Sequence, residues 1–341
     1  TTLSLIGGAV GVLSLRRVER ISAFLWAGLY VALANYAVIL AFHLPTGDYD
    51  GGMWATLAGT SLANGGVSAA IAATAALPLG YFFGITTLIQ LLELAHPSQP
   101  LFRRLLLEAP GTYHHSVIVA SLAERGAAAI GADTLLARVA AYYHDVGKIA
   151  RPYFFIENQV EGTNIHDDMD PSSSAQAILS HVTEGVALAR RYRLPAEVGD
   201  VIQQHHGSRL ASFFYGKAAT AARARGEDLS EEAFRYPGPK PQTKVAALVM
   251  LADAVEATVR SNPRHSSEEL ERVVREIVLE QLLEQLDESG LTLKELDAIR
   301  KAFVSVLQGV YHPRLQYPVL AAHEAPCRER RRGTRNGGEG G

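Results

Sequence analysis

The 341-residue sequence contains a single cysteine, Cys327, which lies in a polar segment near the C-terminal end. With one thiol the chain has no disulfide framework, and a reducing cytoplasm suits it. A surplus of basic residues is also lacking, because the formal net charge is −3. That balance excludes the strongly basic face expected of a protein that binds nucleic acid in bulk.

Charged residues are missing from two long stretches near the N-terminal end. Residues 21–47 and 51–92 contain no Lys, Arg, Asp or Glu. Because a helix needs about 20 apolar residues to cross a membrane, we expect one span from Ile21 to Leu44 and a second at roughly Ser61 to Phe83. The second stretch would form a helix of about 63 Å, so two short spans, or one span with a surface extension, are also possible. The alternative, a buried hairpin of a large soluble protein, is disfavoured by so long an uncharged run.

The loops around the first span predict its orientation. Residues 16–20 read Arg-Arg-Val-Glu-Arg, and the positive-inside tendency places such a loop in the cytoplasm. Residues 43–50 carry two aspartates and no Lys or Arg, as expected of an outside loop. Arg103 and Arg104 follow the second stretch and favour a cytoplasmic exit. We therefore expect a multi-pass protein of the inner (cytoplasmic) membrane, in contact with membrane lipid.

The chain is predicted to divide into three parts. We expect transmembrane helices over residues 1–95, a cytoplasmic domain over 96–321 and a disordered, basic and Gly-rich tail over 322–341. Because the sequence starts with Thr1 inside an apolar run, we expect a fragment of a larger transmembrane bundle whose N-terminus lies upstream. Small residues in the second span favour close helix contacts, either within one chain or in a homo-oligomer.

The part of the chain after the membrane stretches is predicted to be all-α. From Leu101 onward the apolar residues recur at helical spacing, without convincing strand alternation. Pro171-Ser172-Ser173 is expected to cap and start one helix, and Ser266 to Glu269 to open another. The predicted helices cover residues 117–129, 135–143, 174–192, 196–204, 243–260, 266–286 and 292–312.

Histidines and aspartates recur through this second part of the chain in a pattern typical of metal ligands. Imidazoles and carboxylates are the usual ligands of borderline and hard divalent metals. A carboxylate can also bridge two ions, and two-metal sites are a common apparatus for displacement at phosphorus. The pattern therefore indicates a phosphohydrolase with two divalent metal ions. The potential ligands are His115, His144, Asp145, His181, His205, His206 and Asp253.

The surroundings of these residues favour a metal over an ordinary structural role. Asp253 lies among apolar residues, where a buried carboxylate needs a cation or another partner. His181 also lies among apolar residues, and a backbone carbonyl would satisfy it equally well. We expect the His144-Asp145 pair in the last turns of helix 135–143, followed by Gly147 for close backbone approach. Lys148 is placed to meet a phosphate oxygen as a point charge.

Several segments resemble the seven-transmembrane HD-domain phosphodiesterases. The resemblance extends over residues 20–318, including Phe83-Gly84-Ile85-Thr86-Thr87 beside the membrane. It implies an all-α HD domain with a two-metal centre, usually of iron or manganese, and hydrolysis of the cyclic dinucleotide cyclic di-AMP to pApA. It also implies an extracellular sensor domain upstream of these helices in the full-length protein. The segments that carry the resemblance are Gly-Thr-Tyr-His-His-Ser at 111–116, His-Asp-Val-Gly-Lys-Ile at 144–149, residues 151–159, Asn-Ile-His-Asp at 164–167, His-His-Gly at 205–207 and residues 236–241.

The resemblance implies a role for each ligand. His115, His144, Asp145 and Asp253 would hold one ion, and His181 with His205 and His206 the other, with Asp145 as the catalytic bridge. The division of His205 and His206 between the ions stays open, and His114 would lie behind the ligands. The family has a basic residue after the 164–167 segment, where this chain has Asp168, which puts a phosphate contact there in doubt.

The candidate substrate-binding residues are three tyrosines and one lysine. Tyr113, Tyr153 and Tyr236 are candidates to stack on adenine, although ordinary packing would explain most of them equally well. Lys240 belongs to a Pro- and Gly-rich loop, 234–242, that is expected to cover the nucleotide. Three other hypotheses remain at this point: another nucleotide substrate, a membrane receptor that binds nucleotide without turnover, and a structural metal domain with a closed coordination sphere.

Overall fold

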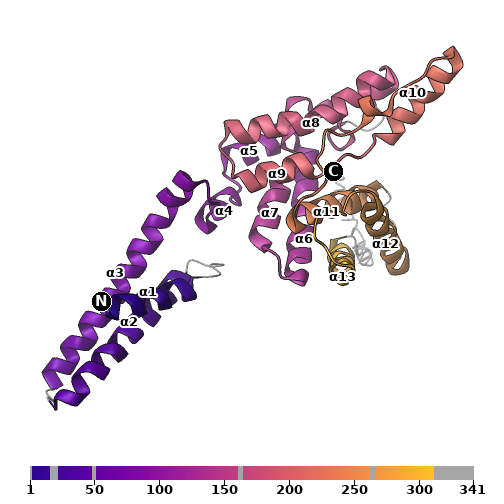
Figure 1. Ribbon diagram of the computed structural model, residues 1–341. Coiled ribbons are helices and arrows are strands. Elements are labelled where there is room, and N and C mark those ends of the chain that lie inside the picture. The colour runs from indigo at the N-terminus through magenta and orange to yellow at the C-terminus, as the bar shows by residue number, and fades with distance from the viewer. Residues whose placement is uncertain (1, 16–21, 48–50, 160–163, 262–265, 311–341) are drawn as a thin grey trace, which may run out of the picture.

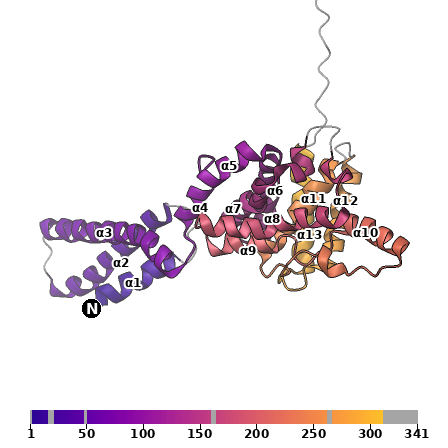
Figure 2. The same ribbon diagram turned by 90° about the horizontal axis from the view of Figure 1, so that it is seen from above.

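Three antiparallel helices form the N-terminal part of the chain. The computed structural model describes residues 2–15, 22–47, 51–159, 164–261 and 266–310. Helices α1 (Thr2–Ser14), α2 (Ser22–His43) and α3 (Gly51–Phe83) lie side by side in both views, apart from the remaining helices (Figures 1 and 2). Two of them, over Ser22–His43 and Gly51–Gly80, are long and apolar enough to cross a membrane.

Helices α2 and α3 contact each other through small residues, as the sequence predicted. A Cβ atom added at Gly65 would lie 2.2 Å from the carbonyl oxygen of Gly28 and 2.8 Å from the Cβ of Ala32. At the same contact the Asn35 side-chain amide donates to Asn64 Oδ1 at 3.3 Å. Close backbone approach and an interhelical hydrogen bond are typical of helix packing within membranes.

The second membrane stretch forms one continuous helix. Helix α3 begins at Gly51, earlier than the predicted span start at Ser61, and its 33 residues extend over about 50 Å. Residues 51–83 of the uncharged run thus form a single helix longer than a bilayer core, not two short ones, and only residues 84–92 lie beyond it. Two parts of the loops on which the orientation was predicted, 16–20 and 48–50 with its two aspartates, lie outside the described residues, as do Thr1 and the predicted tail.

A short helix connects the membrane-type helices to the rest of the chain. Helix α3 ends at Phe83 and is followed by Gly84, which has a positive φ of 66°, and α4 (Leu88–Leu94) starts with Thr87 as its N-cap. The Tyr143 hydroxyl donates to the carbonyl of Leu94 at 2.9 Å, and both residues belong to one buried cluster. Helix α4 is therefore packed against the second part of the chain, in addition to being covalently connected to it.

The second part is an all-α domain, as predicted. Helices α6, α7, α11, α12 and α13 enclose the larger core, in which Leu248, Leu251 and Phe303 are fully buried. The ranges described contain no strand, only an isolated bridge between Leu210 and Arg235. The α-helices are α5 (Pro100–Glu108), α6 (Pro110–Ile130), α7 (Thr134–Tyr143), α8 (Pro171–Arg191), α9 (Ala196–Gln204), α10 (Ser212–Arg225), α11 (Lys244–Ser261), α12 (Ser267–Glu284) and α13 (Leu293–Val310). Short 3₁₀ turns are η1 (Leu44–Thr46), η2 (Val146–Ala150), η3 (Pro152–Phe154), η4 (Ile156–Asn158), η5 (Ile165–Asp167) and η6 (Glu231–Phe234).

One predicted helix start and the predicted placement of one motif are wrong in ways that matter for the site. Helix α7 ends at Tyr143, so His144 is its C-cap and Asp145 lies beyond it with φ −104°, not in the last turns of the helix. Helix α6 begins at Pro110 instead of residue 117, because proline is well suited to the first helical position. Helix α8 is capped by Asp170, whose carboxylate accepts from the backbone of Ser172 and Ser173. The predicted helix start at Ser266 to Glu269 is confirmed, and in the structure Ser266 caps α12 and forms a capping box with Glu269.

Gly147 sets the close approach of the turn after α7 to helix α8. A Cβ added there would lie 1.8 Å from the carbonyl oxygen of His181 and 2.5 Å from the backbone nitrogen of Gly185. We expect Gly147→Ala to lower the free energy of unfolding by about 3 kcal/mol or more, the upper end for overpacking, because both neighbours are backbone atoms. Thermal unfolding would measure this change. Gly199→Ala is the matched control, because its Cβ has nothing within 4 Å, and equal stability of both variants would contradict the argument.

Candidate metal centre

The residues singled out as metal ligands come from five separate parts of the domain and meet at one place. His115 lies in α6, His181 in α8 and Asp253 in α11, while the other four immediately follow helices α7 and α9. Five are buried and two are partly exposed. The buried ones are His115, His144, Asp145, His181 and His205, and the partly exposed ones are His206 and Asp253.

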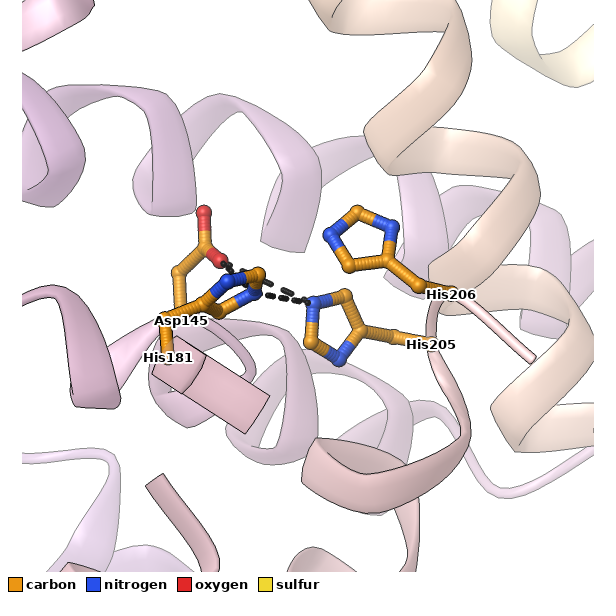
Figure 3. A group of neighbouring side chains, drawn as sticks. All are labelled: Asp145, His181, His205 and His206. Carbon is orange, nitrogen blue, oxygen red and sulfur yellow. Dashed lines mark hydrogen bonds and ion pairs between the residues drawn. The ribbon is translucent and has the colours of Figure 1, made fainter. Parts of the chain in front are cut away.

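The ligand atoms form two groups that share one carboxylate. Within each group the candidate atoms all lie within 4.8 Å of one another. Figure 3 shows the second group, in which the imidazoles of His181 and His205 point to the Asp145 carboxylate. Asp145 belongs to both groups, so it is the only one of the seven placed to bridge two ions. The groups are His115, His144, Asp145 and Asp253, and Asp145, His181, His205 and His206.

Three of the histidines are oriented by the same kind of local hydrogen bond to the backbone. The Nδ1 atoms of His144, His181 and His205 lie 2.6–2.8 Å from the backbone carbonyl three residues earlier. A carbonyl only accepts, so Nδ1 must carry the proton. In the neutral ring the lone pair is then on Nε2, which points into the cluster, and a hydrogen bond to the other ring nitrogen is the usual support of a metal-ligating histidine.

The inward-facing atoms lack partners that would suit them without a cation. His144 Nε2 and Asp145 Oδ1 are buried and make no hydrogen bond. The Nε2 atoms of His181 and His205 face each other at 3.3 Å, an arrangement of two acceptors when both rings are neutral. Buried polar atoms are normally satisfied, so these residues fit divalent metal ions, which would accept all of these lone pairs.

His115 is oriented by a side chain that the sequence analysis missed. Its Nδ1 contacts Glu256 Oε2, and Glu256 is fully buried. Arg260 Nε donates to the same oxygen at 3.2 Å and balances its charge. A carboxylate behind a ligating histidine fixes the ring orientation and raises its basicity. The available signal was spacing, because Glu256 lies three residues after Asp253 and so shares its face of α11.

Neutralising Glu256 should weaken metal binding at the group that contains His115. We expect Glu256→Gln to lower the affinity for Mn²⁺ in that group by about 10–100-fold, the usual effect of losing such a supporting carboxylate. Metal titration followed by calorimetry would measure it, with the exposed Glu276→Gln as the control. An unchanged isotherm would show that Glu256 only fills space.

Lys148 lies at the edge of the centre between two carboxylates. Its Nζ atom is 2.7 Å from Asp145 Oδ2 and 2.7 Å from Glu157 Oε1. Glu157 in turn accepts from the Thr112 hydroxyl at 3.1 Å. Glu157 belongs to the 151–159 segment but was not predicted to be part of the site, although a glutamate so close in sequence to Lys148 was a usable signal.

The charges of the centre shift the pKa values of its members. Burial alone would raise the pKa of Asp145, but Lys148 and His144 outweigh it and hold this pKa well below its usual range. Burial lowers the pKa of His144, yet Asp145 more than compensates and raises it to about 10. The pKa of His181 falls to about 4, chiefly through burial. Without an ion His144 therefore carries a proton that a metal would have to displace, whereas Asp145 and His181 are already deprotonated.

The centre opens into a cavity of about 330 Å³. Tyr236 lines it, with its ring centroid 4.2 Å from that of His206. Burial raises the pKa of Tyr236, so its hydroxyl stays protonated and can donate. The other charged or ionisable residues that line this cavity are His115, Lys148, Glu157, His181, His206, Arg209, Asp253, Arg260 and Glu280.

The structure does not bring the other residues singled out from sequence to this cavity. Tyr113 packs against Phe102 with ring centroids 4.8 Å apart, and His114 is exposed beside it. Tyr153 is 72% exposed. Lys240 donates to Asp287 at 3.0 Å and lines a neighbouring cavity. Asp168 is exposed after η5.

Two family models match the chain, one for each part. The model described as HD domain matches residues 112–258, which contain all seven candidate ligands. The model described as 7TM receptor with intracellular HD hydrolase matches residues 1–87. The second match, together with the two apolar helices, makes this chain a membrane protein.

Individual relatives agree with both matches. Cyclic-di-AMP phosphodiesterase PgpH of Bacillus subtilis is 44% identical over 319 residues, 92% of this chain, and the protein of that name in Listeria monocytogenes is 38% identical over 320 residues, or 93%. The chain spans 44% of the length of each. The crystal structure of the L. monocytogenes phosphodiesterase PgpH HD domain in complex with cyclic-di-AMP is 41% identical, with a TM-score of 0.59, and is covered completely by 64% of this chain.

The match extends over the whole of that solved domain at 41% identity and agrees with the all-α fold. The chain therefore belongs to the family of membrane proteins that join a seven-transmembrane region to an intracellular HD hydrolase domain.

Proposed function

We propose that this protein is a metal-dependent phosphodiesterase that hydrolyses cyclic di-AMP to pApA and so removes a bacterial second messenger. The observation that carries the proposal is the pair of ligand groups that share Asp145 and open into a cavity. An open side distinguishes a catalytic from a structural metal site. The names of the two PgpH relatives support the choice of substrate.

The centre would hold two divalent ions, manganese or iron. His115, His144, Asp145 and Asp253 would bind one ion, and Asp145 with His181, His205 and His206 the other. Two ions a few ångströms apart supply an activated water and stabilise both the attacking and the leaving oxygen of a phosphodiester.

The residues of the chain itself would position and neutralise the substrate. Lys148 contributes a fixed positive charge beside the centre, since the nearby Asp145 and Glu157 carboxylates raise the pKa of its ammonium despite burial. A preorganised cation of this kind favours the developing charge at phosphorus. Tyr236 offers a ring face beside His206 for a base. Tyr113, Tyr153 and Lys240 would contact the nucleotide only beyond this cavity.

The catalytic domain would face the cytoplasm from a multi-pass anchor in the inner membrane. We assign residues 1–95 to the anchor, in contact with lipid, 96–321 to the domain and 322–341 to a tail. The continuous helix α3 and its connection through α4 support this division. In the full-length protein an extracellular sensor domain would precede these helices, and homo-oligomers would form through the small-residue surfaces.

Product analysis tests the proposal directly. The purified chain in detergent, loaded with Mn²⁺, is incubated with cyclic di-AMP and with cyclic di-GMP, and the products are separated. Appearance of pApA, with cyclic di-GMP cleaved far more slowly, is the expected result. Tight binding of cyclic di-AMP without cleavage would instead make the protein a receptor, and cleavage of cyclic di-GMP alone would reassign the substrate.

A further inference from the structure

A second cavity adjoins the one that contains the metal centre. Its volume is about 580 Å³, against about 330 Å³ for the first. Two residues, Arg209 and Glu280, line both cavities and therefore mark the boundary between them. Lys240, which does not reach the metal centre, lines the second cavity.

The sizes of the two cavities matter because the proposed substrate contains two nucleotides. A role for the second cavity in binding this substrate rests on the proposed function. Pockets for drug-sized ligands have volumes of roughly 300–1,000 Å³. The first cavity is at the small end of this range, whereas a cyclic dinucleotide carries two bases, two riboses and two phosphates. When one phosphate lies at the metal centre, the other half of the ring must extend past the boundary at Arg209 and Glu280.

Arg209 is fixed at its backbone but not at its side chain. Its backbone nitrogen donates to the carbonyl of His206 at 3.2 Å, and its carbonyl accepts from Tyr236 at 2.9 Å. Both neighbours line the metal centre cavity. The guanidinium donates to Glu280 at 2.9 Å, and the two side chains are 37% and 51% exposed.

This ion pair is easily exchanged for a ligand. Ion pairs between solvent-exposed side chains contribute little to stability. The free-energy cost of breaking the Arg209–Glu280 ion pair is therefore small. A phosphate offers two oxygens to the planar guanidinium, which recognises such groups in a bidentate manner. The other arginine of the first cavity, Arg260, is instead held by the fully buried Glu256 behind His115.

We propose that Arg209 binds the phosphate of the cyclic dinucleotide that is not being cleaved, and that this phosphate displaces Glu280. The second nucleotide then occupies the cavity of about 580 Å³. Arg209 thereby selects substrates with two phosphates over small diesters with one.

Opposite substitutions at the two partners test this role. With cyclic di-AMP as substrate, Arg209→Gln should raise KM roughly tenfold, the effect of losing one charge-assisted hydrogen bond. Glu280→Gln should lower KM, because the competing carboxylate is gone. Arg209→Lys keeps the charge but not the bidentate geometry and should lie between wild type and Arg209→Gln. For bis(p-nitrophenyl) phosphate, which has one phosphate, the ratio of kcat/KM to that of cyclic di-AMP should rise in Arg209→Gln.

A matched pair of variants controls for general effects on charge. Arg138 and Glu124 form an ion pair of similar exposure, 36% and 37%, and line neither cavity. Arg138→Gln and Glu124→Gln should leave both KM values unchanged. Equal KM values for cyclic di-AMP in wild type, Arg209→Gln and Glu280→Gln would overturn the inference.

The same variants separate this inference from the proposed function. If the wild type binds cyclic di-AMP without cleaving it, the proposed function fails, but the dissociation constants should still rise in Arg209→Gln and fall in Glu280→Gln. If the wild type cleaves cyclic di-AMP and the variants match it, the proposed function stands and the role of Arg209 is wrong.

Discussion

Replacement of Asp145 by asparagine should reduce turnover of cyclic di-AMP by at least about 1,000-fold, because the lost interactions with metal ions are worth several kcal/mol. Asp145 is the one ligand common to both groups, and its two oxygens lie toward different sets of histidines. Asparagine keeps the shape of the side chain but removes the charge that would hold two cations together. Steady-state rates with Mn²⁺ in excess would measure the loss.

Two further measurements make this result specific. Far-UV circular dichroism should show intact helices in Asp145→Asn, and bound metal should fall below that of the wild type. Asp200→Asn, at an exposed position on α9, is the control and should behave as wild type. Substantial activity in Asp145→Asn at full metal content would rule out a bridging carboxylate.

Removal of the metal ions should abolish activity and lower the melting temperature. Without cations the centre leaves buried polar atoms without a hydrogen-bond partner, including His144 Nε2 and Asp145 Oδ1. Ions present at about 100 times their dissociation constant would stabilise the folded domain by about 2.7 kcal/mol. For a domain of this size that corresponds to a shift of about 5 °C or more. Calorimetry before and after chelation would measure the shift.

The restoration step gives this prediction its control. Adding Mn²⁺ back should restore both the activity and the melting temperature, whereas Mg²⁺, which prefers oxygen ligands, should restore much less of either in a centre with five histidines. Activity that survives complete chelation would contradict a metal-dependent mechanism.

Most helices were predictable because their signals are local. The capping box of Ser266 and Glu269 defines the start of α12, and the uncharged run that begins at Gly51 defines α3. The start of α6 was missed because Pro110 and Gly111 usually indicate a loop. Gly111 lies in the first turn of α6, and this position requires glycine because a Cβ there would lie 1.8 Å from the carbonyl oxygen of Glu157. That requirement comes from a segment 46 residues away and has no local signal.

The cluster of candidate metal ligands was predictable, but the charged residues around it were not. Histidine and aspartate among apolar residues are conspicuous in a sequence, and all seven meet in the structure. Glu256 and Arg209 belong to ordinary helix and loop contexts, where a charged residue is most often solvated. Their roles depend on which distant residues they meet, His115 in one case and Glu280 in the other. Only the packing of α6 against α11, and of the 205–210 segment against α12, defines those pairs.

The spectrum of bound manganese tests the two-ion centre most directly. The full chain in detergent is loaded with two equivalents of Mn²⁺ and examined by electron paramagnetic resonance. Two ions bridged by Asp145, about 3.5–4 Å apart, should give the spectrum of a spin-coupled pair, and Asp145→Asn should lose it. A wild-type spectrum of isolated Mn²⁺ alone, at full occupancy, would contradict the shared carboxylate on which the account depends.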